Sequence, residues 1–351
     1  MRSVDVLIIG QGLAGSFLSF WLIRRGVDVL VVDSPQILPA SATGTGTFNP
    51  IAGYRFTPFW NFPDCRDALI EAVTEIERFF NTQFLFPLPI ARFFKDEEQK
   101  KRWEQRKLET VLAEFIDRFL SPEEVAQWVS APLGGFLTRQ SFLLQTEKFL
   151  HSWRQFLFHH DALIESRYTD AQLELDHRSV RWNRQVRARF AVFCPGDSIL
   201  HSHFWNSLLP FQFAKGESLT FAAESLPENL IFNRGVHWAP LGNHIFRFGA
   251  TYRWDDATAL PTAEGYRQLR SALQNFTTVP VTILAHHSGV RITFPDHLPA
   301  LGPHPQYPQL WLFTGLGTKG VGYAPFLASV LAEALFGKDS IPSEVHLNRF
   351  G

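Results

Sequence analysis

Cysteine is almost missing from the sequence, with only Cys65 and Cys194 among 351 residues. Two cysteines cannot form a disulfide framework or a four-cysteine zinc site. A reducing compartment is the simplest interpretation of so little cysteine, so we expect a cytoplasmic protein. No group of residues in the sequence predicts a bound metal.

An excess of charge of either sign is also missing. Lysine and arginine total 33 residues and aspartate and glutamate 34, which leaves a net charge of -1 at pH 7. A dedicated nucleic-acid-binding protein would carry a basic excess, so this balance argues against that class. The arginine-rich stretch 178–189 is a candidate phosphate-binding patch, although the solvated side of a strand pair is its more ordinary interpretation.

Long apolar runs are missing too. A helix that crosses a bilayer needs about 20 apolar residues. The apolar segment 4–23 is interrupted by Asp5 and by several glycines, and no small-residue cleavage site follows a charged start. We therefore expect neither a targeting segment nor a membrane span.

The abundant residues predict a large core. Hydrophobic residues make up 45% of the chain, including 34 phenylalanines and 10 tryptophans, and charged residues make up only 19%. Such a chain can form two domains or one large interleaved α/β unit. The sequence shows no internal repeat and no low-complexity linker, which favours interleaved domains over consecutive ones.

The N-terminus has the pattern of a βαβ unit, and the turn inside it reads G-x-G-x-x-G over residues 10–15. Gly10 makes the tight turn, Gly12 lets a pyrophosphate approach the backbone, and Gly15 lets the helix pack on the strand. The helix N-terminus offers free N–H groups to the phosphates, and Asp33 can accept hydrogen bonds from ribose hydroxyls. The motif alone suits FAD or NAD, whereas Asp33 disfavours the 2′-phosphate of NADP.

Two further glycine clusters follow. Residues 40–50 combine hydroxyls and glycines that suit a phosphate or an isoalloxazine ring, although this stretch alone is more typical of a flexible polar loop. Residues 315–322 lie between a strand at 310–314 and a final helix at 324–336, and so repeat the order strand, glycine loop, helix. A cofactor contacted near both ends of the chain favours FAD over NAD. Lys319 in this loop is a candidate flavin contact, and a solvated surface lysine is the alternative.

The middle of the chain is predicted more coarsely. The helical ranges are 13–25, 65–81, 145–158 and 262–276, with 96–119 as one or two exposed helices. The strand-like ranges are 4–9, 27–33, 84–94, 163–193 and 211–252. The histidine pairs His159-His160 and His286-His287 are not predicted to bind a metal, because adjacent residues on a strand point to opposite faces.

One long motif near the C-terminus carries a family resemblance. Residues 289–302 read GVRITFPDHLPALG and resemble the pattern G-(I/V/L)-R-x-x-(T)-x-D-x-(L)-P-x-(I/L)-G. With the first glycine motif, this segment resembles the FAD-dependent D-amino-acid oxidase (DAO) superfamily, which includes glycine, sarcosine and D-amino-acid oxidases. Within that superfamily the sequence is most similar to the FAD oxidoreductase half of bacterial bifunctional enzymes of tRNA 5-methylaminomethyl-2-thiouridine biosynthesis. The shared segments are the spacing of 40–50, 249–252, 296–299 and 315–325.

The resemblance also has departures. It is loose over 84–128, residues 48–50 and 54–56 differ from those bifunctional enzymes, and their methyltransferase half has no counterpart in the sequence. The C-terminal glycine loop contains no cysteine, so the thioether to flavin of monomeric sarcosine oxidase is not expected there. We therefore predict that FAD binds non-covalently.

The resemblance implies an α/β fold in which a Rossmann-like FAD-binding domain is interleaved with a substrate domain built on a mixed or antiparallel sheet. The FAD-binding domain would comprise residues 1–82, 140–203 and 286–351. The substrate domain would comprise residues 83–139 and 204–285.

The resemblance further implies an enzyme that oxidises the C–N bond of an amino acid or an N-substituted glycine by hydride transfer to flavin. Arg291 would clamp the substrate carboxylate through its planar fork. His237 would replace a substrate-contacting tyrosine of glycine oxidase, although a histidine there is as often structural, and Lys319 would stabilise the reduced ring. The residues implied to bind FAD are Gly10, Gly12, Leu13, Ala14, Gly15, Asp33, Ser41, Gly46, Gly196, Gly317, Thr318, Lys319, Gly320 and Val321.

Two alternative functions stay open. The same chemistry would remove a carboxymethyl group from a modified wobble uridine in tRNA, since that group is an N-substituted glycine, although the charge balance does not favour tRNA. The other alternative is a non-catalytic FAD-binding subunit of a dehydrogenase complex. The preferred partner is a small-molecule amine or amino acid, and the sequence does not distinguish oxygen from another electron acceptor.

Overall fold

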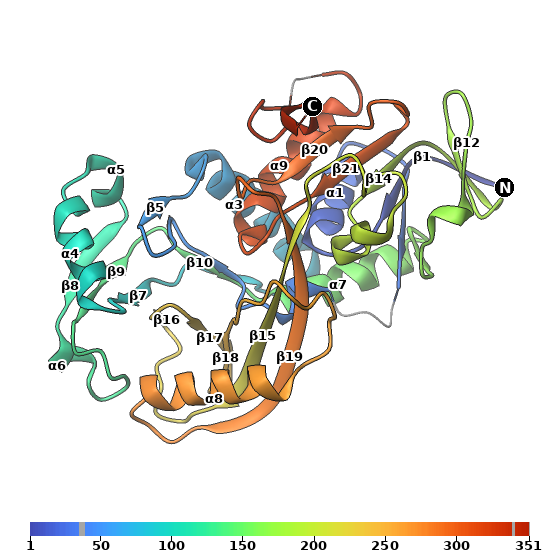
Figure 1. Cartoon of the computed structure of the whole chain (residues 1–351). Coiled ribbons are helices and arrows are strands. Elements are labelled where there is room, and N and C mark those ends of the chain that lie inside the picture. The colour runs from blue at the N-terminus through green and yellow to red at the C-terminus, as the bar shows by residue number, and fades with distance from the viewer. Residues whose placement is uncertain (35–38, 339–340, 351) are drawn as a thin grey trace.

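The computed structural model describes residues 1–34, 39–338 and 341–350. Its first large sheet has the order β11-β2-β1-β14-β13-β12, and β21 joins β14 and carries β20 (Figure 1). The central strands β11, β2, β1, β14 and β21 run parallel to their neighbours in that group. The bounds are β1 (Arg2–Ile9), β2 (Val29–Asp33), β11 (Leu163–Glu165), β12 (Leu173–Leu175), β13 (Val180–Trp182), β14 (Val186–Phe193), β20 (Ala300–Pro303) and β21 (Leu310–Thr314).

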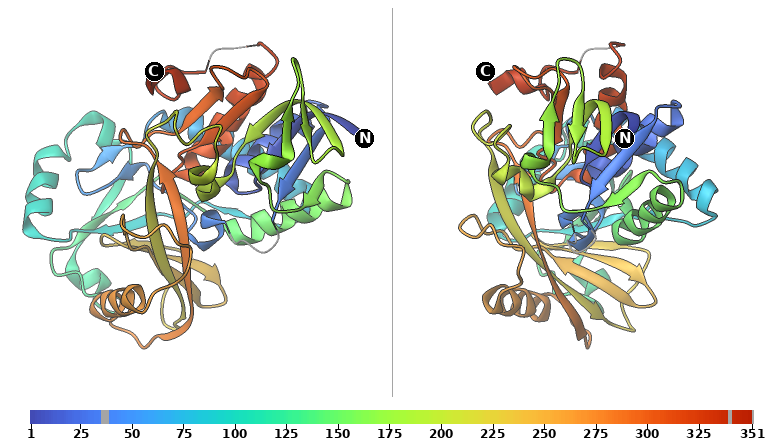
Figure 2. Two further views of the ribbon diagram at one scale, coloured as in Figure 1. Left: turned by 45° about the vertical axis from the view of Figure 1, so that its right-hand side comes forward. Right: turned by 90° about the vertical axis from the view of Figure 1, so that its right-hand side faces the viewer.

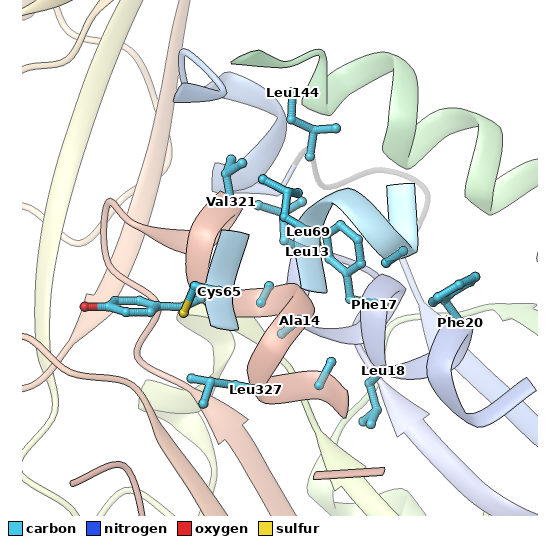
Figure 3. Packing of buried hydrophobic residues seen from close by; sticks show 14 of the residues in the cluster. Leu13, Ala14, Phe17, Leu18, Phe20, Cys65, Leu69, Leu144, Val321 and Leu327 are labelled. Atoms are coloured by element: carbon cyan, nitrogen blue, oxygen red, sulfur yellow. The ribbon is translucent and has the colours of Figure 1, made fainter. Parts of the chain in front are cut away.

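Helices on the faces of this sheet explain why its strands are continuous apolar runs. Strands buried on both faces have no solvent-facing side, so they do not alternate between polar and apolar residues. Helix α1 packs against α9 and α3, and the side chains of Leu13, Phe17, Leu69 and Leu327 lie in one cluster between these helices (Figure 3). The bounds are α1 (Leu13–Arg24), α3 (Phe62–Phe80), α7 (Thr146–His159) and α9 (Gly320–Ala334).

The second large sheet has the order β19-β15-β18-β17-β16-β7-β9-β8. All neighbours in it are antiparallel except β16 and β7. Its longest strands, β15 and β19, run side by side through the middle of the molecule (Figure 2, olive and orange), and α8 packs on one face. The bounds are β7 (Ile90–Phe93), β8 (Ile116–Leu120), β9 (Gly135–Thr138), β15 (Gln212–Ala222), β16 (Ile231–Asn233), β17 (His237–Gly242), β18 (Ile245–Gly249), α8 (Ala263–Phe276) and β19 (Thr282–Thr293).

Short elements complete the fold. Strands β3, β10 and β6 form a small sheet, and β4 and β5 form a hairpin. The bounds are α2 (Ala40–Thr43), β3 (Thr47–Phe48), β4 (Ile51–Ala52), β5 (Thr57–Pro58), β6 (Leu85–Phe86), α4 (Glu97–Arg106), α5 (Thr110–Ala113), α6 (Pro122–Val125) and β10 (Phe142–Leu144). None of the helices in the described ranges is long and apolar enough to cross a bilayer.

The chain passes between the two large sheets several times. It begins in the first sheet, enters the second at β7, returns at β11, enters the second again at β15 and ends in the first (Figure 1). This path confirms the predicted α/β class with an interleaved, largely antiparallel second sheet. The residue boundaries of the two domains stay a prediction.

For two predicted helical segments, one boundary differs from the structure. The range 96–119 was expected to be helical, but its end forms β8, which pairs with β9. The last helix begins at Gly320 and not at residue 324. A Cβ on Gly322 would lie 2.6 Å from the rings of Phe48 and Phe59, so glycine in this first turn serves close packing. The glycines in this segment predict a loop because glycine has a low helix propensity. In the structure the close packing at Gly322 outweighs that propensity, and the helix begins earlier.

Candidate functional site

The glycine turn between β1 and α1 has no room for side chains at two positions. Gly10 has a φ of +101°, and a Cβ on it would overlap the Cys194 carbonyl oxygen at the end of β14. A Cβ on Gly15 would overlap the Gly10 carbonyl oxygen. The turn therefore packs directly against the neighbouring strand end, as the motif predicts.

The N-terminus of α1 has the features of an anion site. Gly12 is the N-cap residue and has no side chain with which to cap the helix, and the first turn holds no acidic residue. The Leu13 N–H points to the Ser41 hydroxyl at 3.4 Å, and the Ala14 and Gly15 N–H groups follow in the first turn. A Cβ on Gly12 would make only ordinary contacts, the nearest with Ser41 Oγ at 3.6 Å. The open side at Gly12 is thus free for a ligand and is not filled by packing.

Asp33 lies where the motif places it, at the end of β2, but it already has two partners. Its carboxylate accepts hydrogen bonds from the Gln11 N–H (3.0 Å) and from Arg154 Nη1 (2.6 Å). Arg154 also pairs with Glu165 at 2.8 Å. The sequence analysis missed Arg154, which comes from α7, because a helix surface position carries no local signal for such a pair.

The C-terminal glycine loop brings a second uncapped helix end to the same place. Lys319 is the N-cap residue of α9, and no side chain caps that helix. A Cβ on Gly320 would lie 3.3 Å from Leu13 Cδ1, so the two helix N-termini adjoin, and Figure 3 shows Val321 beside Leu13. The Gly317 N–H donates to the Ile292 carbonyl at 3.0 Å, which ties this loop to the strand that carries Arg291.

The Lys319 ammonium group is not a solvated surface charge. Nζ lies 3.5 Å from the Tyr323 hydroxyl and stands over the rings of Phe59 and Tyr323. Burial lowers the pKa of Lys319 from its usual value. This position contradicts the alternative of a surface lysine.

The other predicted cofactor contacts are spread around these loops. Gly46 packs so closely on Leu144 that a Cβ would overlap its carbonyl oxygen. Gly196 lies three residues after the end of β14 and has open space at its Cβ position. Thr318 is exposed in the C-terminal loop.

Arg291 provides a buried donor without a partner. It lies opposite Ala214 in the β15–β19 pair, and its guanidinium covers Gly216, where a Cβ would collide with Nη2. The Tyr252 ring lies 5.0 Å from the guanidinium carbon. Nη1 is buried without a hydrogen-bond partner, and burial lowers the Arg291 pKa. A buried, unsatisfied guanidinium is costly unless an anion binds to it.

His237 lies on the same face of this sheet. It pairs with Gly249, which pairs with Ser218 of β15, and directly opposed residues point to one face. His237 Nε2 is buried without a partner. Burial and the nearby Arg92 charge lower the His237 pKa to about 4, so the ring is neutral at pH 7.

The low pKa of His237 predicts a specific pH dependence of stability. Between pH 6.5 and 4 the unfolded chain binds a proton at this ring and the folded chain does not, so its contribution is complete above pH 6.5 and is lost as the pH falls through that window. His237→Gln should gain about 3 kcal/mol relative to wild type between pH 7 and pH 4, measured by urea unfolding. The exposed His177→Gln is the control. Identical pH profiles for wild type and His237→Gln would contradict the burial argument.

Sequence analysis missed four further residues near the site. Arg92 interrupts an apolar strand, and an isolated charge in such a strand is the signal that could have revealed it. Tyr252 and the buried residues Lys215 and Glu217 gave no comparable signal, because their contacts join segments that are distant in sequence.

In the arginine-rich stretch 178–189 two arginines have a carboxylate partner, and the two histidine pairs lie in different settings. Arg181 and Arg184 both pair with Glu174, at 3.5 and 3.2 Å, as expected for the solvated side of a strand pair. His286 and His287 contact different partners on opposite faces of β19, whereas His159 and His160 lie at the end of α7 and not on a strand as assumed. Across the described ranges, no three His, Cys, Asp or Glu side chains gather as metal ligands.

The residues present fit a flavin dinucleotide. Two adjoining helix N-termini without caps suit a long ligand that is electronegative at both ends. Segment 40–43 reaches the sheet, where the Ser218 hydroxyl donates to the Thr43 carbonyl at 2.7 Å. The three glycine clusters and Arg291 therefore converge on one region, as the sequence predicts.

Comparison with known proteins gives consistent matches. The family described as FAD dependent oxidoreductase (DAO) matches residues 5–334. The chain is 26% identical over 351 residues to the tRNA 5-methylaminomethyl-2-thiouridine biosynthesis bifunctional protein of Idiomarina loihiensis, covering 95% of this chain but only 56% of that protein. It is 22% identical to the glycine oxidase of Pseudomonas putida, with 97% of this chain and 96% of that one covered.

Solved structures show the same fold. The glycine oxidase of Geobacillus kaustophilus superposes with a TM-score of 0.83 at 19% identity and 99% coverage of both chains. The match thus spans nearly the whole length of these two glycine oxidases and about half the length of the bifunctional protein.

Proposed function

The chain belongs to the DAO family of FAD-dependent oxidoreductases, as its motifs predict, and on that premise we propose that it oxidises the C–N bond of an amino acid or N-substituted glycine-type amine. One observation carries this proposal. The Arg291 guanidinium is buried, has an unpartnered Nη1, and lies beside the glycine loops that suit the cofactor. An amine substrate with a carboxylate supplies the missing anion.

FAD, when bound, would supply the hydride acceptor. Arg291 would hold the carboxylate and so orient the α-carbon, and the Tyr252 ring would cover the ion pair. The buried Lys319 ammonium would stabilise negative charge on the ring. Loss of the hydride from a neutral amine gives an imine, which water hydrolyses to an oxo acid and a free amine.

The FAD contacts form part of the same proposal. The phosphates would lie at the N-terminus of α1 beside Ser41, and the pyrimidine end of the ring near the start of α9. FAD would bind non-covalently, because Cys65 and Cys194 are both buried and neither lies in the C-terminal glycine loop. Two free cysteines also suit the predicted cytoplasmic location.

The first test is the visible spectrum of the purified protein, followed anaerobically as glycine, sarcosine, proline and N-carboxymethyl amines are added. We expect a yellow protein whose visible flavin absorption is bleached by at least one of them. A protein that cannot be reconstituted with FAD would overturn the proposal. Bleaching by none of these amines would transfer the assignment to the alternatives.

A tRNA substrate is the second candidate function, and the similarity over 95% of the chain to the bifunctional tRNA enzyme favours it. Bleaching by tRNA that carries carboxymethylaminomethyl-uridine, with an affinity that falls steeply with salt, would establish it. Intact FAD binding without turnover of either substrate class would favour the non-catalytic subunit.

A further inference from the structure

A second buried cation lies on the sheet that carries Arg291. Arg92 on β7 is 5% exposed, and its guanidinium donates to the carbonyls of Ile51 (2.6 Å) and Gly53. No carboxylate of the described residues pairs with it, and burial lowers its pKa to about 10. The guanidinium also stands over the Phe56 ring, with its central carbon 4.6 Å from the ring centroid. A buried charge that has carbonyl groups and an aromatic ring but no anion beside it marks a place where an anion would be stabilised.

The sheet register places Arg92 in line with His237. Arg92 pairs with Asn233, Asn233 with His237, His237 with Gly249, and Gly249 with Ser218. Paired residues of neighbouring strands share a face, so this row and Arg291 lie on the same side of the sheet. His237 Nε2, which is buried and unpartnered, lies next to the Arg92 charge.

The Arg291 guanidinium and His237 lie at two ends of one stretch of this sheet face, which we call the floor. The guanidinium covers Gly216, which is two residues from Ser218 along β15, or about 7 Å. Ser218 and His237 are two strands apart, or about 10 Å, so Gly216 and His237 are separated by about 12 Å across the sheet. Gly249 between them has no side chain, and a Cβ there would lie 2.8 Å from Ser218 Cβ.

We propose that Arg92, Asn233 and His237 form a second anion subsite, and that the substrate is a secondary amine with one carboxylate on each side of its nitrogen. This inference rests on the proposed function and names its substrate class. Arg291 would bind the carboxylate next to the carbon that loses the hydride. His237 would donate a hydrogen bond from Nε2–H to the other carboxylate, and the positive charge of Arg92 would stabilise it.

The dimensions suit such a diacid. In a CH2–N–CH2 bridge of bonds near 1.5 Å, the two carboxyl carbons lie about 5 Å apart. A hydrogen bond of about 3 Å at each end gives a span of about 11 Å, close to the separation across the floor. The reaction balances without a further reactant: hydride loss gives the imine, and hydrolysis gives glyoxylate and a primary amine that retains the second carboxylate.

A purely structural role of Arg92 is the competing explanation, because its two hydrogen bonds also hold the β4–β5 turn. Binding of unreactive analogues to the holoenzyme separates the two. Diglycolate has an ether oxygen in place of the amine and two carboxylates, and methoxyacetate has the same ether and one carboxylate. Their affinities follow from the shift of the flavin absorption band on titration.

We expect wild type to bind diglycolate at least about 30-fold more tightly than methoxyacetate, since a buried charge-assisted contact is gained. Arg92→Gln and His237→Phe should each reduce that preference to about 3-fold or less with little change in methoxyacetate affinity. His237→Phe leaves the Arg92 hydrogen bonds intact and serves if Arg92→Gln fails to fold. The control is Arg247→Gln, a buried arginine of the same sheet that pairs with Glu147, and it should keep the preference.

Equal affinity of wild type for both analogues, or variants that weaken both alike, would overturn the second subsite. The outcome is independent of turnover. If wild type prefers diglycolate but no amine bleaches the flavin, the second subsite is supported and the proposed function is contradicted. If monocarboxylate amines bleach the flavin but wild type does not prefer diglycolate, the proposed function is supported and the second subsite is contradicted.

Discussion

Replacing Arg291 with alanine is expected to lower kcat/KM for a carboxylate-bearing amine about 1,000-fold, or roughly 4 kcal/mol. The guanidinium lies beside the glycine loops, and its buried Nη1 has no partner among the described residues. Removal would leave the substrate carboxylate desolvated and unpaired, which costs 2–5 kcal/mol or more at buried charge pairs. The flavin spectrum should be unchanged, because Arg291 lies on the second sheet and not in the proposed FAD contacts.

A matched variant tests whether position matters as well as charge. Gly216→Ala keeps Arg291 but places a methyl group where the guanidinium lies. We expect this variant to lose much of the same activity while it keeps FAD. Turnover of Arg291→Ala within a few-fold of wild type would contradict the clamp. So would equal losses for an amine that has no carboxylate.

The sequence predicted those parts of the site whose signal is local. The G-x-G-x-x-G turn over 10–15 is recognisable because strand, turn and helix follow within a few residues, and Gly10 and Gly15 are required by contacts close to that turn. The position of Arg291 followed from a long motif. Lys319 was correctly placed beside the final helix, although the predicted start of that helix, residue 324, is four residues later than the observed one.

The sequence did not predict features that arise from pairing across the sheet. Arg92 reaches His237 only because β7 pairs with β16, and β16 with β17, across more than 140 residues of chain. The sequence predicted that Asp33 can accept hydrogen bonds from ribose, but it did not show that Arg154 from α7 also binds this carboxylate. Such contacts depend on the fold as a whole, so residue spacing alone cannot show them.

A buried charge cluster on the opposite face of the second sheet holds the segment that carries Tyr252. Lys215 is fully buried, and its Nζ donates to Asp256 (2.6 Å) and Thr258 (3.3 Å). Glu217, also fully buried, accepts from the Thr262 N–H (2.9 Å) and hydroxyl (2.7 Å). These contacts fix the chain after β18, and Tyr252 in that stretch lies over Arg291.

The largest stability effect is expected at the Lys215–Asp256 pair, and it should be asymmetric. Asp256→Asn leaves the Lys215 ammonium buried without its carboxylate, and stranding a fully buried charge costs roughly 3 kcal/mol or more. Lys215→Met leaves the Asp256 carboxylate, which is partly exposed (21%) and so can be reached by water, and the loss of stability should therefore be smaller.

The double variant Lys215→Met/Asp256→Asn tests whether the unpaired Lys215 ammonium causes the loss of stability. It should be more stable than Asp256→Asn alone. Urea unfolding at a fixed FAD concentration measures all of these variants under one linkage condition. The control is Glu98→Gln, which breaks an exposed pair with Arg102 (3.2 Å) and should change stability little. If the second substitution adds a further loss, Lys215 does not depend on Asp256 for its burial, and another group must hold the Tyr252 segment in place.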